Sequence, residues 1–363
     1  MSFVSWLDGY DPAERARLGG KNASLGELLA AGLPVPPGFA VTVDAYHTVR
    51  GHAEVRQAVT GLLADVDLGD PVALEQLSAA IRRRIEAVPL DDRVAAAVRA
   101  AYAELCERCT SDAVPVAVRS SATSEDLPDA SFAGEHDTYL WVRGPTEVLR
   151  HLTRCWSSLF TARAIAYRRE RGYDHDVVAM SVGVQKMVRP TASGVAFTLN
   201  PRDGDRSQVA VEAAWGFGEA IVSGEVTPDS FLVDKVLGEI VQRTISDKAV
   251  EYRLGDGDRV ERVEVDEARR TTPSLTDDQI KAVARLARLA EKHYRCPQDV
   301  EWALDADLPP DQAVTLLQAR PETVWSRQTP TPIAGAANDP MASIVATLLS
   351  PLHTRERSDT PGP

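Results

Sequence analysis

A β-prone run at residues 114–118 ends on Arg119, continues into a loop of small residues, and returns to a second β-prone run at 138–142. Such a loop lets backbone N–H groups close around phosphate oxygens, while an arginine at its start supplies a fixed positive charge. The pattern predicts a strand–loop–strand unit with an anion-binding turn. The alternative is that Arg119 pairs with Glu125 or Asp126 of the same loop.

The order of the remaining elements indicates the fold class. Apolar residues at helical spacing predict helices within 50–110, 145–172 and 276–294, and β-prone runs occupy much of the rest up to residue 326. Because strands and helices do not alternate as regular βαβ units, the pattern favours an α+β fold over one doubly wound sheet.

Charge and cysteine content limit the partners and the compartment. The 363 residues carry a formal net charge of −13, which makes nonspecific binding to nucleic acid or to an anionic membrane a poor fit. The first ten residues include Asp8 and no basic cluster, so we expect no secretory leader. Four cysteines need no disulfide framework and favour a cytoplasmic location. Cys106 and Cys109 form one CxxC, which we interpret as ordinary helix cysteines, the alternative being redox or metal chemistry.

The chain lacks both common glycine motifs for nucleotides, G-x-x-x-x-G-K-[ST] and G-x-G-x-x-G. Residues 19–22 are Gly-Gly-Lys-Asn, so Lys21 follows a flexible turn and precedes a helix. Its ammonium and the helix N-terminus would both attract phosphate. The alternative is an exposed lysine at a helix cap.

Two further segments could contact the same ligand. Gly134 and Thr138 flank the return into the second strand, where a glycine permits close backbone approach, although Gly134 fits an ordinary hairpin equally well. Gln185 and Met187 lie in a hinge-like stretch whose backbone edge and apolar ceiling suit an adenine ring. Met187 could equally fill the core.

Four polar residues near the end of the chain predict a metal site. Asp299 and Glu301 lie in one β-prone run, and Gln318 and Arg320 in another. If the runs pair, Glu301 and Gln318 can point to one face, and strand alternation places Arg320 on the face of Gln318. Carboxylate and amide oxygens suit Mg²⁺ beside phosphates, and Arg320 would neutralise phosphate charge. The alternative is a surface ion pair across a hairpin.

Together these motifs resemble the nucleotide-binding domain shared by phosphoenolpyruvate synthase, pyruvate phosphate dikinase and rifampin phosphotransferase. The resemblance covers about residues 15–325, and the ordered set is more specific than any single motif. The matching segments, in chain order, are Leu18–Glu27, Val118–Gly134, Ser193–Thr198, Trp215–Glu219 with Pro228-Asp229, Asp299–Trp302 and Leu317–Pro321.

The resemblance implies an ATP-grasp fold in which two lobes clamp ATP with Mg²⁺. It implies a first lobe at 1–186, which includes the helical segment 50–110, and a second lobe with the metal-binding residues at 187–326. Residues 327–363 would form a flexible tail rich in Pro, Thr and Ala, with a short helix candidate at 341–349. The implied nucleotide and metal contacts are Lys21, Arg119, Gly134, Thr138, Gln185, Met187, Glu301, Gln318 and Arg320. Of these, Glu301 and Gln318 would hold the metal, and Lys21, Arg119 and Arg320 would act in catalysis.

This chain departs from the family pattern in two ways. Glu135 stands where a glutamine is expected and Asp137 where a glutamate is expected, which could tune the phosphate loop. Full-length relatives also carry a phosphorylated histidine on a swivelling domain, whereas none of the seven histidines here lies in a Gly/Ser-rich loop. We therefore expect a separate phosphohistidine-domain protein as partner, as in phenylphosphate synthase.

The resulting prediction is the ATP-binding subunit of a dikinase-type phosphotransferase. It would cleave ATP to AMP and phosphate and pass the β-phosphoryl group to the partner's histidine, which phosphorylates a small hydroxyl or enol acceptor. The alternatives are a self-contained ATP-grasp kinase or ligase, and a nucleotide-binding regulatory protein without turnover.

Overall fold

The computed structural model of the protein describes residues 2–64, 70–122, 137–172, 178–256 and 259–326. The chain divides into two compact units, Met1–Glu322 and Thr323–Pro363. All helices and strands of the described residues lie in the first unit. The predicted tail at 327–363, with its helix candidate at 341–349, lies outside the described residues. Within the described ranges, no helix has the length and apolar character needed to cross a membrane.

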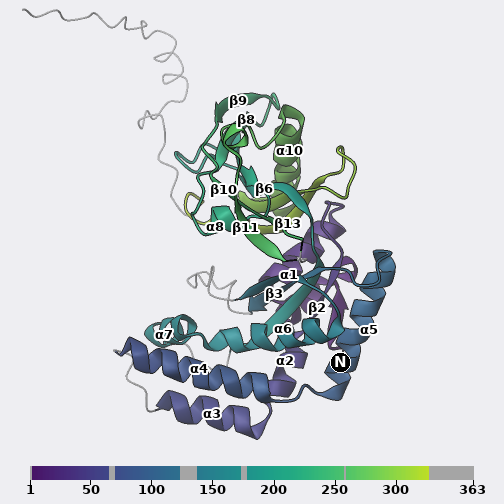
Figure 1. Cartoon of the computed structure of the whole chain (residues 1–363), viewed down its shortest axis with the longest axis vertical. Coiled ribbons are helices and arrows are strands. Elements are labelled where there is room, and N and C mark those ends of the chain that lie inside the picture. Colours follow the sequence, from purple (N-terminus) through teal and green to yellow (C-terminus); the bar gives the residue numbers. More distant parts are fainter. Residues whose placement is uncertain (1, 65–69, 123–136, 173–177, 257–258, 327–363) are drawn as a thin grey trace, which may run out of the picture. The chain divides into compact units, whose positions relative to one another are not determined.

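The first of two large sheets contains five antiparallel strands in the order β1-β2-β5-β3-β4 (Figure 1). Its inner strands are almost fully buried because their β-branched and small residues are packed on both faces. The strands are β1 (Val4–Trp6), β2 (Gly38–Val41), β3 (Val116–Ala122), β4 (Thr138–Val142) and β5 (Met180–Lys186).

Six helices form the main apolar core with one face of this sheet, where Phe39 and Val182 contribute buried side chains. They are α2 (Val43–Arg50), α3 (Ala53–Ala64), α4 (Pro71–Ala87), α5 (Asp92–Arg108), α6 (Pro145–Ser157) and α7 (Ala162–Glu170). The helices predicted within 50–110 and 145–172 are therefore confirmed. Short 3-10 turns complete this part at η1 (Leu7–Gly9), η2 (Pro12–Glu14) and η3 (Ser158–Phe160).

The second large sheet contains six antiparallel strands in the order β13-β12-β6-β7-β8-β9. They are β6 (Pro190–Phe197), β7 (Gln208–Trp215), β8 (Asp229–Asp234), β9 (Ile240–Thr244), β12 (Gln298–Asp305) and β13 (Val314–Pro321). Helix α10 (Asp277–Tyr294) begins with a capping box between Thr276 and Gln279 and packs its apolar stripe against one face of the sheet. The long helix predicted at 276–294 is confirmed.

Smaller elements lie between β7 and α10 in the chain. They are α8 (Glu219–Val222), α9 (Glu267–Arg270) and a separate two-stranded sheet of β10 (Val250–Leu254) and β11 (Val260–Glu264). A fully buried ion pair between Lys248 and Asp229 holds this region together. The Asp229 carboxylate also accepts hydrogen bonds from the backbone and hydroxyl of Ser274, so the buried charge is well compensated.

The architecture is α+β, as predicted, because antiparallel sheets carry segregated helices rather than βαβ crossovers. The predicted boundary after residue 186 falls in the short connection between β5 of one sheet and β6 of the other. The division into two lobes remains a prediction.

Helix α1 (Arg15–Ala30) contacts both large sheets. Its helical conformation is interrupted at Gly19, which has φ 69° and ψ 166°. A Cβ atom built on Gly19 would lie 2.5 Å from the carbonyl oxygen of Ser121 on β3. Further along the helix, the Ser24 hydroxyl donates a hydrogen bond of 2.8 Å to the carbonyl of Ala319 on β13. The absence of a side chain at Gly19 therefore allows α1 to lie against the end of β3.

We predict that Gly19→Ala lowers the free energy of unfolding by about 2–5 kcal/mol, because backbone strain adds to the clash with Ser121. Gly32→Ala is the matched control, since Gly32 also has a positive φ of 73° but nothing lies within 4 Å of its Cβ position. It should cost about 1–2 kcal/mol. Urea unfolding of both variants tests the prediction, which is wrong if the two losses are equal.

Candidate functional site

Strands β12 and β13 pair with each other, which is the condition on which the predicted metal site depends. Glu301 lies directly opposite Gln318, and Asp299 lies opposite Arg320. The intervening residues Val300 and Ala319 are buried in the core under α10, so the four polar residues share the opposite face of the sheet. The Arg320 Nε lies 3.3 Å from Asp299 Oδ2, forming an ion pair on that face.

A β-bulge interrupts this pairing beside Glu301. Glu301 pairs with Gln318 but Trp302 pairs with Leu316, which leaves Leu317 without a partner in the ladder. The Leu317 carbonyl accepts a hydrogen bond of 3.1 Å from Arg119 Nη1. The bulge thus presents a backbone oxygen to an arginine from the other sheet.

Arg119 of β3 reaches Glu301 of β12 on the second sheet. Its Nη2 lies 3.6 Å from Glu301 Oε2, and its side chain is 23% exposed. Thr138, the first residue of β4, is its direct cross-strand neighbour and is exposed. The structure therefore brings together Arg119, Thr138, Glu301 and the Gln318 strand, while the predicted contact Gly134 lies outside the described residues.

Lys21 lies two residues after the break in α1, in the first turn of the resumed helix. Hydrogen bonds from the Asn22 side chain to Leu18 O (3.1 Å) and Ser181 Oγ (2.8 Å) fix this turn on the first sheet. Lys21 is half-buried. Burial of Cys155 raises the pKa of its thiol, and the positive charge of Lys21 opposes that rise. The contact of Gly19 with Ser121 therefore places Lys21 near the strand that carries Arg119.

The hydrogen-bond donors of the two predicted adenine contacts, Gln185 and Met187, are used within the fold. Gln185 is 3% exposed, and its Nε2 donates to the carbonyl of Pro36 at 3.1 Å, so this nitrogen is already used within the fold. The Met187 N–H likewise donates to Pro115 O at 2.8 Å. The Met187 side chain packs with Ala117 and Phe217 in a small apolar cluster.

That apolar cluster joins strand β3, the Gly-rich turn before α8 and the β10–β11 hairpin. Leu140, Trp141, Tyr252, Leu254 and Val260 pack around its three buried members. Because these three members are buried, the cluster fits the alternative that Met187 fills the core, and the adenine contact stays a prediction.

Three carboxylates near the site have pKa values raised chiefly by burial: Asp299, Glu212 and Glu219. Arg320 opposes this rise at Asp299, and Arg119 opposes it at Glu219. Glu212 lies in the same cross-strand row as Glu301, with Val195 of β6 between them. Sequence reasoning assigned no role to Glu212 or Glu219, because their position depends on strand register and on the turn before α8.

The acidic residues of this face fit a divalent cation that is shared with a ligand. In the described part of the chain, no group of three or more His, Cys, Asp or Glu residues forms a complete metal site. However, Asp299 Oδ1 is buried and has no hydrogen-bond partner among the residues that the structure describes, and the Glu301 side chain is 40% exposed. Mg²⁺ commonly takes only one or two protein carboxylates beside phosphate oxygens. Asp299, Glu301 and Gln318 are the residues that could hold it.

Comparison with known proteins finds similar sequences over most of the chain. Residues 15–339 match the family model of the pyruvate phosphate dikinase AMP/ATP-binding domain. The chain is 43% identical to a probable phosphoenolpyruvate synthase of Methanocaldococcus jannaschii, over 90% of this chain and 27% of that protein. It is 46% identical to a rifampicin phosphotransferase of a Streptomyces species, over 87% of this chain and 35% of that protein. It is 40% identical to a phosphoenolpyruvate synthase of Aeropyrum pernix, over 90% of this chain and 43% of that protein. The chain therefore spans less than half the length of each of these relatives.

The raised pKa of Asp299 predicts a pH dependence of stability. Because its folded pKa lies above the unfolded value of about 4, the folded state binds more protons in the window above that value, and stability falls as pH rises through it. Asp299→Asn should reduce this fall and leave the melting temperature at pH 7 equal or higher. Asp307→Asn, which removes an exposed carboxylate paired with Arg189, is the control. Thermal unfolding between pH 4 and 8 tests this, and a larger loss at pH 7 for Asp299→Asn than for the control contradicts it.

Proposed function

Because the chain belongs to the family of the pyruvate phosphate dikinase AMP/ATP-binding domain, we propose that it binds ATP with Mg²⁺ in an ATP-grasp arrangement and carries out the ATP half of a phosphoryl transfer. The observation that carries this proposal is the position of Arg119. It contacts the bulge carbonyl of Leu317 and lies beside Glu301, with Thr138 on the neighbouring strand. These residues come from both sheets and offer the charges that a nucleotide phosphate chain requires.

The chemistry needs positioning and charge neutralisation more than covalent participation of the protein. We assign Arg119, Arg320 and Lys21 to the phosphate oxygens, whose charge grows in the transition state. Asp299, Glu301 and Gln318 would hold Mg²⁺, which when bound neutralises charge between phosphate groups. The adenine would pack beside the buried apolar cluster of Ala117, Met187 and Phe217.

We place the accepting histidine on a separate phosphohistidine-domain protein, which would then phosphorylate a small hydroxyl or enol acceptor. Among the described histidines, His47, His151 and His293 lie on helices, and the His151 Nδ1 lies 2.8 Å from Glu147 O, a backbone contact in its own helix. In balanced form, ATP, water and histidine give AMP, inorganic phosphate and phosphohistidine. The α–β and β–γ phosphoanhydride bonds break, and water takes up the γ-phosphoryl group.

ATP with Mg²⁺ should stabilise the protein without any partner. At a concentration about 100 times the dissociation constant, ligand binding contributes about 2.7 kcal/mol, which raises the melting temperature by roughly 3–8 °C. Arg119→Met and Glu301→Gln should remove most of this shift. Arg243→Gln on β9, which breaks an exposed ion pair with Asp277 of α10, should keep the shift. An equal shift in all variants would show that the site is assigned to the wrong residues.

The products of ATP turnover distinguish the proposal from its alternatives. The purified chain is incubated with ATP and Mg²⁺, with and without a candidate phosphohistidine-domain protein, and followed by phosphorus NMR. We expect AMP and phosphate only with the partner. The rate should be at least about 100-fold lower for Arg119→Met, because this variant lacks the positive charge that neutralises the phosphates. ADP from the chain alone would identify a direct kinase or ligase instead. Binding without turnover with every partner tried would favour a regulatory protein.

A further inference from the structure

We propose that Arg82 of helix α4 is a positioning residue of the nucleotide site, acting through Asp137 to fix the start of β4, where Thr138 faces Arg119. This inference rests on the proposed function, because its first test measures the binding of ATP. It assigns a role in the site to α4, one of the helices within the segment 50–110.

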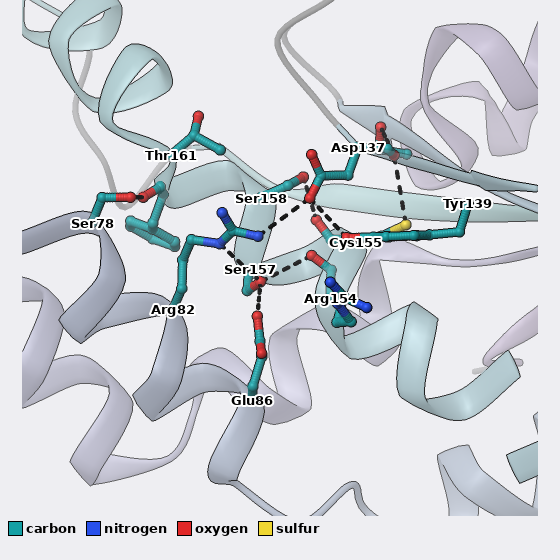
Figure 2. Close-up of polar contacts among 12 residues, drawn as sticks. Ser78, Arg82, Glu86, Asp137, Tyr139, Arg154, Cys155, Ser157, Ser158 and Thr161 are labelled. Carbon is teal, nitrogen blue, oxygen red and sulfur yellow. Dashed lines mark hydrogen bonds and ion pairs between the residues drawn. The ribbon is translucent and has the colours of Figure 1, made fainter. Parts of the chain in front are cut away.

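The contact is formed by one carboxylate oxygen with two donors. Arg82 Nη2 lies 3.3 Å from Asp137 Oδ2, and the Tyr139 hydroxyl donates to the same oxygen at 2.8 Å (Figure 2). The Tyr139 ring also lies under Arg154 of α6, whose guanidinium carbon is 4.9 Å from the ring centroid. Asp137 is thus held from α4 on one side and from its own strand on the other.

The backbone of Asp137 is held as firmly as its side chain. Its carbonyl oxygen accepts a hydrogen bond of 3.1 Å from Ser120 Oγ and lies 3.8 Å from Cys155 Sγ. Ser120 directly follows Arg119 on β3. The residue that precedes Thr138 is therefore connected to β3, α4 and α6 together.

Arg82 is itself oriented by its neighbours. Its Nε lies 3.5 Å from Ser157 Oγ, and the Ser157 hydroxyl lies 2.6 Å from Glu86 Oε1, one turn further along α4 (Figure 2). Two α4 side chains thus converge on the end of α6, and the Arg82 guanidinium is directed at Asp137. A side chain ordered in this way can transmit a fixed position to the strand that it contacts.

Because the Arg82–Asp137 pair is partly exposed, its effect on ligand binding can be distinguished from its effect on protein stability. The Arg82 and Asp137 side chains are 29% and 36% exposed, and ion pairs at such exposure contribute little to unfolding free energy. An effect on ligand binding larger than the effect on the melting temperature would therefore report the geometry of Thr138 and Arg119. An ordinary surface ion pair would change neither by much.

The test is a double-mutant cycle on ATP binding. The dissociation constant for ATP with Mg²⁺ is measured by calorimetry for the full chain, Arg82→Gln, Asp137→Asn and the double variant. We expect each single change to weaken binding about 5- to 30-fold, and the double variant to be no weaker than the worse single variant, because both act through one contact. Arg83→Gln is the matched control, since Arg83 is an exposed neighbour on the same helix whose side chain hydrogen-bonds only to Ala79 O among the described residues. It should bind ATP like the wild type.

Binding within twofold of the wild type in Arg82→Gln, or fully additive losses in the double variant, would overturn the inference. If the wild type itself does not bind ATP, the proposed function fails, and hydrogen exchange then decides the positioning role separately. Faster exchange at residues 137–142 in Arg82→Gln, with unchanged exchange in β5 and a melting temperature within about 2 °C of the wild type, would support it. Unchanged exchange at 137–142 would refute it.

Discussion

The close approach of helix α1 to strand β3 is the contact on which the site depends. The chain leaves the helical conformation at Gly19 and resumes it at once, so the turn with Lys21 lies against Ser121. The same helix then hydrogen-bonds to Ala319 of β13 through Ser24. One helix therefore contacts both the strand that carries Arg119 and the strand that carries Gln318 and Arg320. A side chain at Gly19 would push these elements apart.

Much of the arrangement follows from local patterns in the sequence. The pairing of Glu301 with Gln318 could be predicted because both runs alternate polar and apolar residues, and two-residue alternation decides which face each residue takes. The helices at 50–110 and 276–294 could be predicted from their apolar spacing. The hairpin of β10 and β11 was not predicted, although Val250, Tyr252 and Leu254 alternate with polar residues. Its two runs are only five residues long, and β11 breaks the alternation at Arg262 and Val263.

The remaining features depend on tertiary contacts that local patterns do not contain. The bulge that frees the Leu317 carbonyl arises where two strands differ by one residue in register, which neither strand reveals alone. Gln185 was predicted as a ligand contact, but its side-chain nitrogen bonds to Pro36, 149 residues away in the chain. Arg82 is separated from Asp137 by 55 residues, so nothing near either residue indicates the pair. The ligand contacts, the cytoplasmic location and the partner remain predictions.

The charges of the site explain how an acidic protein can hold a polyanion. Arg119 and Arg320 lie beside Glu301 and Asp299, so each arginine is already partly neutralised by a carboxylate. The phosphates of a nucleotide without a divalent cation would be repelled by these carboxylates. A divalent cation without a nucleotide would be repelled by the arginines. Under the proposed function each ligand would remove the repulsion that the other encounters, so binding of ATP and of Mg²⁺ would be mutually favourable, and by linkage equally so in both directions. Burial of Asp299, which raises its pKa, strengthens this coupling because a buried carboxylate gains most from a bound cation.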